Sequence, residues 1–167
     1  GYARTWNGPI GEIILFNNVP TYQQSSEIET YLAIKYGISK GDWYIGGTNA
    51  AGTAATTTLF ATSSNAPYNQ NIFGIGRNDT WGLHQRQSKS VNTFDFFWVG
   101  NNNIVDNTIG NNASVGNDIG SNNSYLLMGD DNARLAWSRT ASVLNKRLLA
   151  RTWNLTETGS IGSVKLS

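Results

Sequence analysis

The sequence predicts an all-β fold: a β-sandwich of short antiparallel strands with one α-helix near the N-terminus. Two observations predict it. Short runs of β-branched and aromatic residues recur along the chain, separated by turn-forming Gly, Asn, Asp and Pro residues, which is the pattern of a β-sandwich. Only one segment, Thr21 to Gly37, has helical spacing. The 167 residues suit one domain, or one domain plus a fragment.

The predicted helix, TYQQSSEIETYLAIKYG, carries signals at both ends. Thr21 and Gln24 have the spacing of a capping box, in which each side chain binds the other residue's backbone N–H. Gly37 stands where a left-handed C-terminal cap is expected, and Lys35 in the last turn suits the helix dipole. One face of the helix is predicted at three- and four-residue spacing: Ile28, Tyr31, Leu32 and Lys35.

Strands are expected on both sides of this helix. Gly11–Phe16, GEIILF, is short, apolar and bounded by turn residues. Because a strand needs ladder partners, this one is expected to pair with residues after 40 or with another chain. After the helix, strands are expected at Trp43–Ile45 and Thr56–Ala61, followed by a turn at 65–71.

The middle of the chain is the most strand-like part. Ile72–Gly76 and Phe94–Val99 are compact apolar runs, with a turn expected at Arg77–Gly82. Leu83–Val91 alternates polar residues and is expected to be a solvated or edge strand. The Asn- and Gly-rich stretch 101–123 is interpreted as a long surface loop.

Order is expected to return after residue 124. Tyr125–Met128 and Arg134–Ser138 are predicted to form a hairpin around the turn GDDN. Ala150–Leu155 and Ser163–Leu166 are predicted to pair in the same way.

Composition limits the function classes. Twelve basic and eleven acidic residues nearly balance, so no nucleic-acid partner is expected. No apolar run approaches membrane-spanning length, so no membrane insertion is expected, and the lack of cysteine excludes disulfides and thiolate metal sites. Low charge with many Asn, Thr and aromatic residues is typical of secreted β-proteins and predicts an extracellular or cell-surface location. The abrupt start, GYARTWNGPIGEI, suggests a piece of a longer protein.

Two stretches carry a resemblance. Residues 6–38, with GEIILFNN and YLAIKYGI, resemble the terminal strand and helix of concanavalin/laminin-G-like modules in secreted bacterial surface proteins. IFGIGRNDTWGLHQRQSKSVN, LLMGDDN and RTWNLTETGSIGSVKLS are similar to an uncharacterised β-sandwich domain of secreted, adhesin-like Bacteroidota proteins exported by the type IX system. The resemblance implies a terminal strand plus helix at 1–40 and a β-sandwich domain at 41–167. The upstream laminin-G-like body is missing, and the family supplies no catalytic residues.

Catalytic candidates are few. His84 is the single histidine, without a nucleophile elbow nearby, and is interpreted as an exposed strand residue. Glu12 stands alone and is expected to pair with an Arg or to cap backbone groups. No paired-carboxylate pattern of a glycosidase occurs. We therefore expect no enzymatic activity.

A calcium site is a second possibility. Asp130, Asp131 and Asn132 supply the oxygen ligands that Ca²⁺ prefers, and Asp118 lies in a similar loop. Turn formation by Asp explains both places equally well, so calcium and simple turns stay open. No other cofactor is expected.

Aromatic residues suggest a ligand site. Trp6, Trp43 and Trp81 lie near predicted turns and are candidates for stacking on sugar rings, although Trp also packs under loops. The aromatic residues of Phe94–Val99 lie on both faces of a strand and are interpreted as core or interface. A basic bias near the C-terminus is interpreted as a solvated face: Arg134, Arg139, Lys146, Arg147 and Arg151.

The sequence therefore favours a non-enzymatic, extracellular structural or adhesive module of a bacterial surface protein. Its expected partners are other copies of itself or adjacent domains of a longer chain, met through strand edges. The alternative is a carbohydrate-binding module that binds glycans through exposed Trp and Asn side chains, with calcium as a possible aid.

Overall fold

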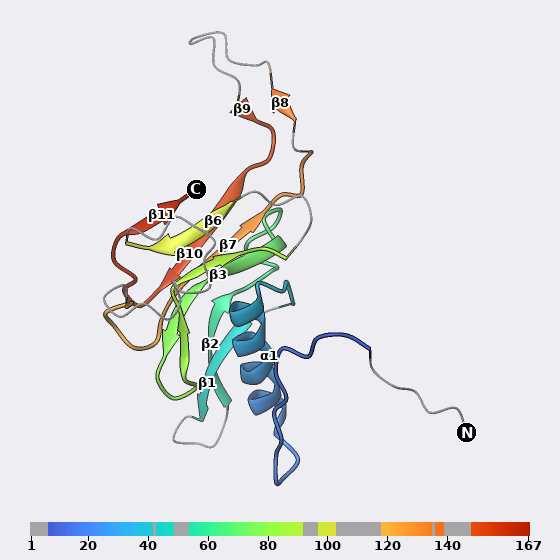
Figure 1. Ribbon diagram of the computed structural model, residues 1–167, viewed down its shortest axis with the longest axis vertical. Coiled ribbons are helices and arrows are strands. Elements are labelled where there is room, and N and C mark those ends of the chain that lie inside the picture. The colour runs from blue at the N-terminus through green and yellow to red at the C-terminus, as the bar shows by residue number, and fades with distance from the viewer. Residues whose placement is uncertain are drawn as a thin grey trace, which may run out of the picture.

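The computed structural model describes residues 7–41, 43–48, 54–91, 97–102, 118–134, 136–138 and 148–167. In these residues the protein is mostly β, and antiparallel sheets pack in layers with a single helix beside them (Figure 1). The predicted all-β, sandwich-like fold with one α-helix is confirmed.

The elements follow one another in a simple order. Helix α1 (Tyr22–Tyr36) comes first. The strands after it are β1 (Trp43–Thr48), β2 (Ala54–Phe60), β3 (Gln70–Asn78), β4 (Leu83–Gln85), β5 (Gln87–Lys89), β6 (Trp98–Asn101), β7 (Ser124–Asp130), β8 (Trp137–Ser138), β9 (Leu148–Leu149), β10 (Trp153–Thr158) and β11 (Val164–Leu166).

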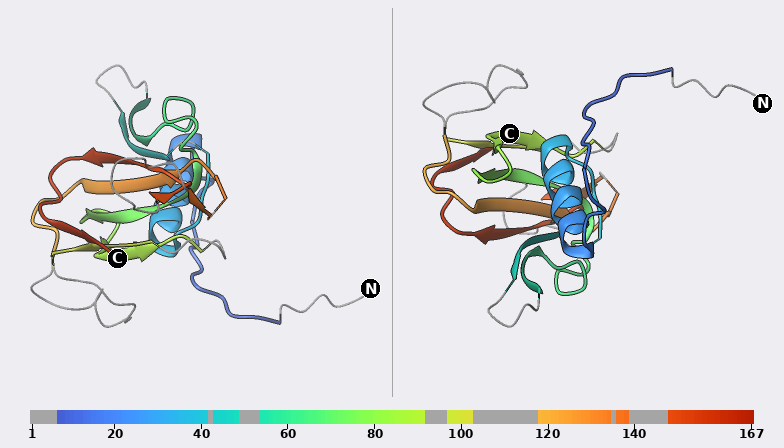
Figure 2. Two further views of the ribbon diagram at one scale, coloured as in Figure 1. Left: turned by 90° about the horizontal axis from the view of Figure 1, so that it is seen from above. Right: turned by 90° about the horizontal axis from the view of Figure 1, so that it is seen from below.

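A four-stranded sheet with the order β10-β7-β3-β4 forms the central layer. The three-stranded sheet β11-β6-β5 covers one of its faces, and α1 with the β1–β2 hairpin covers the other (Figure 2). Strands β8 and β9 form a separate pair that projects from one end. Within the described residues, no helix has the length and hydropathy needed to span a membrane.

Strand β7 contributes to both hydrophobic cores because successive side chains point to opposite faces of a sheet. Tyr125 and Leu127 face the helix side, and Leu126 and Met128 face the three-stranded sheet. The core on the helix side consists of Ala33, Ile34, Leu59, Phe60, Ile72, Leu83, Tyr125 and Leu127. The core on the other side consists of Phe73, Ile75, Val99, Ile119, Leu126, Met128 and Ile161.

Two glycines of β3 make room for this packing. A Cβ on Gly76 would lie 2.6 Å from the Tyr125 ring, and one on Gly74 would lie 2.6 Å from a methyl carbon of Leu127. These distances are too short for real contacts. Glycine at both positions therefore allows the large side chains of β7 to lie flat against β3.

Both predicted caps of α1 are confirmed. The Thr21 side chain accepts a hydrogen bond from the Gln24 amide, and the Gln24 side chain accepts one from the Thr21 amide. Gly37 is left-handed, with φ 64°, and its amide donates to the Ala33 carbonyl.

The face of α1 that is buried differs from the face indicated by the spacing of apolar residues. The buried residues are Ser26, Thr30, Ala33 and Ile34. The residues of the predicted face are only half-buried: Ile28, Tyr31, Leu32 and Lys35. Small side chains on the buried face allow the helix to approach β1 and β3 closely, which a count of apolar residues does not reveal.

The prediction of a strand at Gly11–Phe16 is wrong. This strand was expected to be the terminal strand of the unit 1–40. These residues form no strand, and no backbone hydrogen bond joins residues 9–19 to another described residue. The segment runs beside α1 (Figure 1). Side-chain hydrogen bonds of Glu12 attach it to the helix. The domain boundary at residue 40 stays a prediction, although α1 shares a core with β2, β3 and β7.

Two predicted strand pairings are wrong. Strand β7 pairs with β3 and β10 rather than with β8, and β10 and β11 lie in different sheets. Gly159 and Gly162, both with positive φ, lie between β10 and β11. Ile161 between them is buried against the second core, so it fixes this crossing from one sheet to the other.

The segment Leu83–Val91 is divided between two sheets as edge strands β4 and β5, which confirms the edge prediction. It is not solvated, since Arg86, Gln87, Ser88 and Ser90 are buried. Trp43–Ile45, Thr56–Ala61 and Ile72–Gly76 fall in β1, β2 and β3 as predicted. Of the predicted strand 94–99 and loop 101–123, residues 94–96 and 103–117 lie outside the described residues.

Candidate functional site

A groove of about 460 Å³ opens between three parts of the chain. Residues 12–16 form one wall, α1 forms the floor, and the turn between β3 and β4 forms the other wall. The lining side chains are Glu12, Ile14 and Phe16 from the segment, Gln24, Glu27, Ile28 and Tyr31 from α1, and Thr80 and Trp81 from the turn. The surface is mainly apolar, with two carboxylates and one amide among the aromatic rings.

Glu12 holds the N-terminal wall against α1. Its carboxylate accepts hydrogen bonds from Lys35 Nζ at 2.9 Å and from the hydroxyls of Tyr31 and Tyr36 at 3.0 and 3.3 Å. Lys35 Nζ also donates to the Tyr31 hydroxyl at 2.6 Å. Gly11 lies flat on the Tyr36 ring, where an added Cβ would be 3.1 Å from ring atoms. We call these four side chains, Glu12, Tyr31, Lys35 and Tyr36, the Glu12 clamp.

The clamp shifts the charges of its members. The hydrogen bond from Lys35 lowers the pKa of Glu12 below its ordinary value of 4.5, against the opposing effect of partial burial. The hydrogen bond with Tyr31 raises the pKa of Lys35, and burial raises the pKa of Tyr36. At neutral pH Glu12 and Lys35 therefore form an ion pair beside the neutral phenol of Tyr36.

Two buried residues, Asn78 and Tyr125, position Trp81 in the turn between β3 and β4. Its amide donates to the Asn78 side-chain oxygen at 3.0 Å, and the Asn78 amide group donates to the Tyr125 hydroxyl at 2.7 Å. The Trp81 and Tyr125 rings lie 6.5 Å apart in a tilted arrangement. Burial raises the pKa of Tyr125 to about 12, although the Asn78 bond opposes the shift, so the phenol stays neutral.

Of the three tryptophans predicted to contact a sugar, the structure places Trp81 in the groove. Trp6 lies outside the described residues, and Trp43 lies in β1 with a side chain that is not described. Sugar contact by these residues stays a prediction. The sequence did not indicate the Glu12 clamp, although it suggested an ion pair for Glu12. The partner is Lys35 rather than an Arg.

The residues proposed for calcium form a structural network. Asp130 is fully buried and accepts from the Asn71 side chain at 2.9 Å, from the Asn132 amide at 2.8 Å and from Arg151 Nη1 at 3.1 Å. Arg151 is itself buried, so its prediction as part of a solvated basic face is wrong. A cation at Asp130 would compete with this guanidinium.

Asp131 is also engaged, at the start of the next turn. Its carboxylate accepts from the Thr152 hydroxyl at 2.7 Å and from the Ala133 amide at 3.0 Å. Burial alone raises the pKa of Asp131, but the bonds from Thr152 and Ala133 outweigh it, and the pKa lies below its ordinary value. Asn132 is exposed, with φ 52°. In the described residues, no three His, Cys, Asp or Glu side chains gather as a metal-binding group; calcium stays a prediction.

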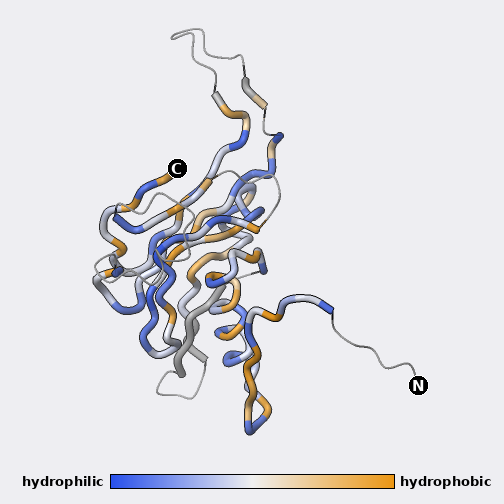
Figure 3. Tube along the Cα trace, in the orientation of Figure 1, coloured by the Kyte–Doolittle hydropathy of each residue, from blue (hydrophilic) through white to orange (hydrophobic). Residues whose placement is uncertain are grey.

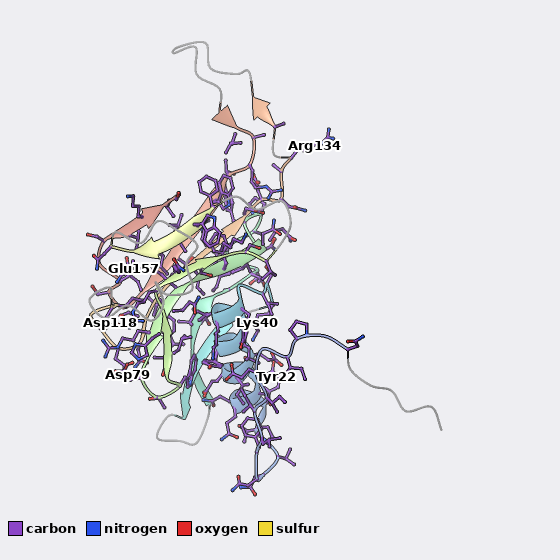
Figure 4. The ribbon with its side chains drawn as sticks, in the orientation of Figure 1. Tyr22, Lys40, Asp79, Asp118, Arg134 and Glu157 are labelled. Carbon is purple, nitrogen blue, oxygen red and sulfur yellow. The ribbon has the colours of Figure 1, made fainter. Side chains whose placement is uncertain are left out.

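Asp118, in the segment before β7, and Asp79, in the turn between β3 and β4, lie on the same side of the molecule (Figure 4) and form a charged cluster with His84 of β4. Arg86 binds Asp118 through Nε at 2.7 Å and Nη2, and this bond lowers the pKa of Asp118. Arg77 binds Asp79, and His84 Nε2 lies 3.5 Å from the same carboxylate. His84 is exposed, as predicted. The cluster joins the β3–β4 turn to the segment before β7, since the Asp79 amide donates to the Asn122 side chain.

Comparison with known proteins gives a family. A family model described as "Domain of unknown function (DUF8202)" matches residues 24–167. The chain belongs to this family. The family match contains α1 from Gln24 onward and all the strands of the described residues, so the helical floor of the groove and Trp81 lie inside it, whereas Glu12, Ile14 and Phe16 precede it. No curated protein and no solved structure matches the chain.

We expect Asp130→Asn to destabilise the protein by about 3 kcal/mol, because it leaves the buried Arg151 charge without its counter-ion. The free energy of unfolding from urea denaturation measures this loss. Asp79→Asn is the matched control, since Asp79 is an exposed member of a surface ion pair, and it should change stability little. Equal effects of the two substitutions would contradict the structural role of Asp130.

We expect the Glu12 clamp to weaken in acid. Because the pKa of Glu12 is lowered in the folded state, its contribution to stability is present above pH 4.5 and is lost as the pH falls through the lowered value. NMR titration of the Glu12 carboxyl carbon should give a midpoint below 4.5, and Lys35→Met should raise it. Lys40→Met, which removes the partner of Glu29, should leave that midpoint unchanged. An identical midpoint in the wild type and Lys35→Met would exclude the clamp.

Proposed function

We propose that this chain is a non-enzymatic structural or adhesive module of a bacterial surface protein, extracellular and exported by the type IX system. The observation that supports this proposal is an exposed apolar segment, residues 10–16, attached to the outside of a well-packed β-fold (Figure 3). We call it the N-terminal segment. In this proposal, the N-terminal segment makes the contacts with other copies or with adjacent domains.

The apolar side chains of this segment are highly exposed to solvent, which is unfavourable. Ile13 is 69 % exposed and Leu15 is 88 % exposed, and Ile10 and Phe16 are more than half exposed. Isolated apolar residues are ordinary on protein surfaces, but a contiguous group marks an interaction site. Burying each such side chain contributes about 1.5–3 kcal/mol, so covering the segment is strongly favourable.

The side chains of the segment alternate as in a strand, although no described strand is paired with it. Glu12, Ile14 and Phe16 face the groove, while Ile13 and Leu15 point to solvent, which is the alternation of a β-strand. In the described part of the chain, no backbone group of residues 9–19 makes a backbone hydrogen bond. Such a segment is suited to strand addition, in which main-chain bonds give affinity and alternate side chains give specificity.

A homotypic adhesion assay tests this function. Beads coated with the chain should aggregate, and beads coated with the double variant Ile13→Lys, Leu15→Lys should not. The two side chains are exposed, so the variant keeps the fold. Leu155→Lys is the control, because Leu155 is an exposed apolar residue on β10, far from the segment. Aggregation of the double variant at the wild-type rate would overturn the proposal.

The groove supports a second candidate, carbohydrate binding. Trp81 and Tyr31 offer ring surfaces, and Gln24, Glu27 and Thr80 offer polar groups beside them. Sugar sites combine aromatic faces with a small number of placed polar groups.

For this candidate, we expect Trp81→Ala to weaken oligosaccharide binding at least tenfold, because aromatic anchors dominate such contacts. Glycan-array screening followed by calorimetry measures it, with and without added calcium. Trp98→Ala is the control, since Trp98 is half-buried on β6 outside the groove. Equal losses in the two variants, or no glycan retained by the wild type, would exclude the glycan function.

A further inference from the structure

We infer that the N-terminal segment of one copy adds as a strand to the outer edge of β11 in a second copy, so that copies join head to tail. This inference rests on the proposed function, and it names both the partner and the surface that receives the segment. Two observations support it: the hydrogen-bonding pattern of β11, and the match between its side chains and those of the segment.

The outer edge of β11 carries backbone groups that point away from its sheet. Trp98 and Ser167 exchange both backbone hydrogen bonds, and the Asn102 amide donates to the Ser163 carbonyl. In an antiparallel ladder, bonded pairs alternate with pairs whose N–H and C=O groups point outward. Val164 and Leu166 stand opposite Asn101 and Val99 in this register, so their backbone groups point to the outer edge.

Strand β6 provides a check on this assignment. If Val99 and Asn101 form the non-bonded pairs with β11, their backbone groups must point to the opposite neighbour, β5. The Asn101 amide does so, since it donates to the Arg86 carbonyl at 2.8 Å. No backbone hydrogen bond from another described residue reaches Val164 or Leu166 on their outer side.

The outer edges of two other strands have neighbours in the fold. Strand β5 lies against the C-terminal end of α1, where the Val91 amide donates to the Gly37 carbonyl and Gly37 packs on the Lys89 carbonyl. Beside β10, the Asn65 side chain accepts from the side chains of Asn154 and Thr156 and occupies part of the approach to this strand. Compared with these two edges, that of β11 offers more room for an added strand.

The side chains of β11 match those of the segment. Val164 and Leu166 share one face of β11 and are 37 % and 45 % exposed, and Ile13 and Leu15 share one face of the segment. A paired strand would place the four apolar side chains together, which favours cross-strand pairing, while Glu12 on the other face of the segment stays bound to Lys35.

The two surfaces of one molecule cannot meet each other. The segment is clamped to α1, on one side of the central sheet, and β11 belongs to the sheet on the other side. Figures 1 and 2 show the segment and β11 at opposite sides of the molecule. A contact between different surfaces of identical copies does not close a dimer, and it continues as an open chain of molecules unless a ring forms.

The substitution Leu166→Pro tests the outer edge of β11 without disturbing the fold. The Leu166 amide points away from β6, so Leu166→Pro removes an outward donor without removing a hydrogen bond of the existing sheet, and proline is tolerated on an edge strand. Leu166→Ile keeps the amide and an apolar side chain of the same size, so it is the matched control. Circular dichroism and thermal melting should show both variants folded.

Sedimentation velocity of the purified chain at increasing concentration tests the inference. We expect the wild type and Leu166→Ile to form growing oligomers, and Leu166→Pro and the double variant Ile13→Lys, Leu15→Lys to remain monomers. A mixture of Leu166→Pro with the double variant should give 1:1 dimers only, because one supplies the intact segment and the other the intact edge.

Different outcomes overturn the inference on β11 and the proposed function. If Leu166→Pro assembles like the wild type while the double variant does not, the segment uses another surface: the inference on β11 is overturned, and the proposed function stands. If the double variant also assembles like the wild type, the proposed role of the segment falls too. A wild-type chain that remains monomeric at about millimolar concentration would overturn the head-to-tail contact.

Discussion

The pairing of β3 with β7 is the constraint on which the rest of this structure depends. Both faces of this ladder are buried, so each strand must supply apolar side chains in both directions. Glycine at 74 and 76 lets Tyr125 and Leu127 lie against β3, and Phe73 and Ile75 fill the opposite face. The helix, the β1–β2 hairpin and the three-stranded sheet are all positioned by these two faces. Tyr125 in turn supports Asn78 and Trp81, and so fixes one wall of the groove.

Local signals in the sequence predicted the helix and several of the strands, but they did not predict how the strands pair. The caps of α1 depend on residues three or four apart, so Thr21, Gln24 and Gly37 could be assigned from the sequence. The partners of β10 and β11 depend on the path of the chain around Gly159 to Gly162, where a buried Ile161 directs the two strands into different sheets. Composition gives no information on that path, and consecutive strands are ordinarily good candidates for pairing.

The same distinction applies to the candidate site: a residue with a local signal was predicted, and contacts between residues far apart in the sequence were not. Trp81 was found because a tryptophan in a turn is conspicuous. The Glu12 clamp was missed because it joins Glu12 to three side chains of α1 that lie 19 to 24 residues away. Arg151 was misinterpreted because a basic residue is expected at the surface. It is buried because Asp130, 21 residues earlier, neutralises it inside the protein.

The segment Gly11–Phe16 is the place where sequence and structure disagree most usefully. Its residues are those of a strand and its side chains alternate as in a strand, yet no described strand provides its ladder. A backbone that is left without hydrogen bonds inside an apolar surface is costly once water is removed. Whatever covers Ile13 and Leu15 must therefore also satisfy the amides and carbonyls between them, which a flat apolar surface or a helix cannot do. A β-edge satisfies both requirements, because it presents backbone donors and acceptors together with an apolar face.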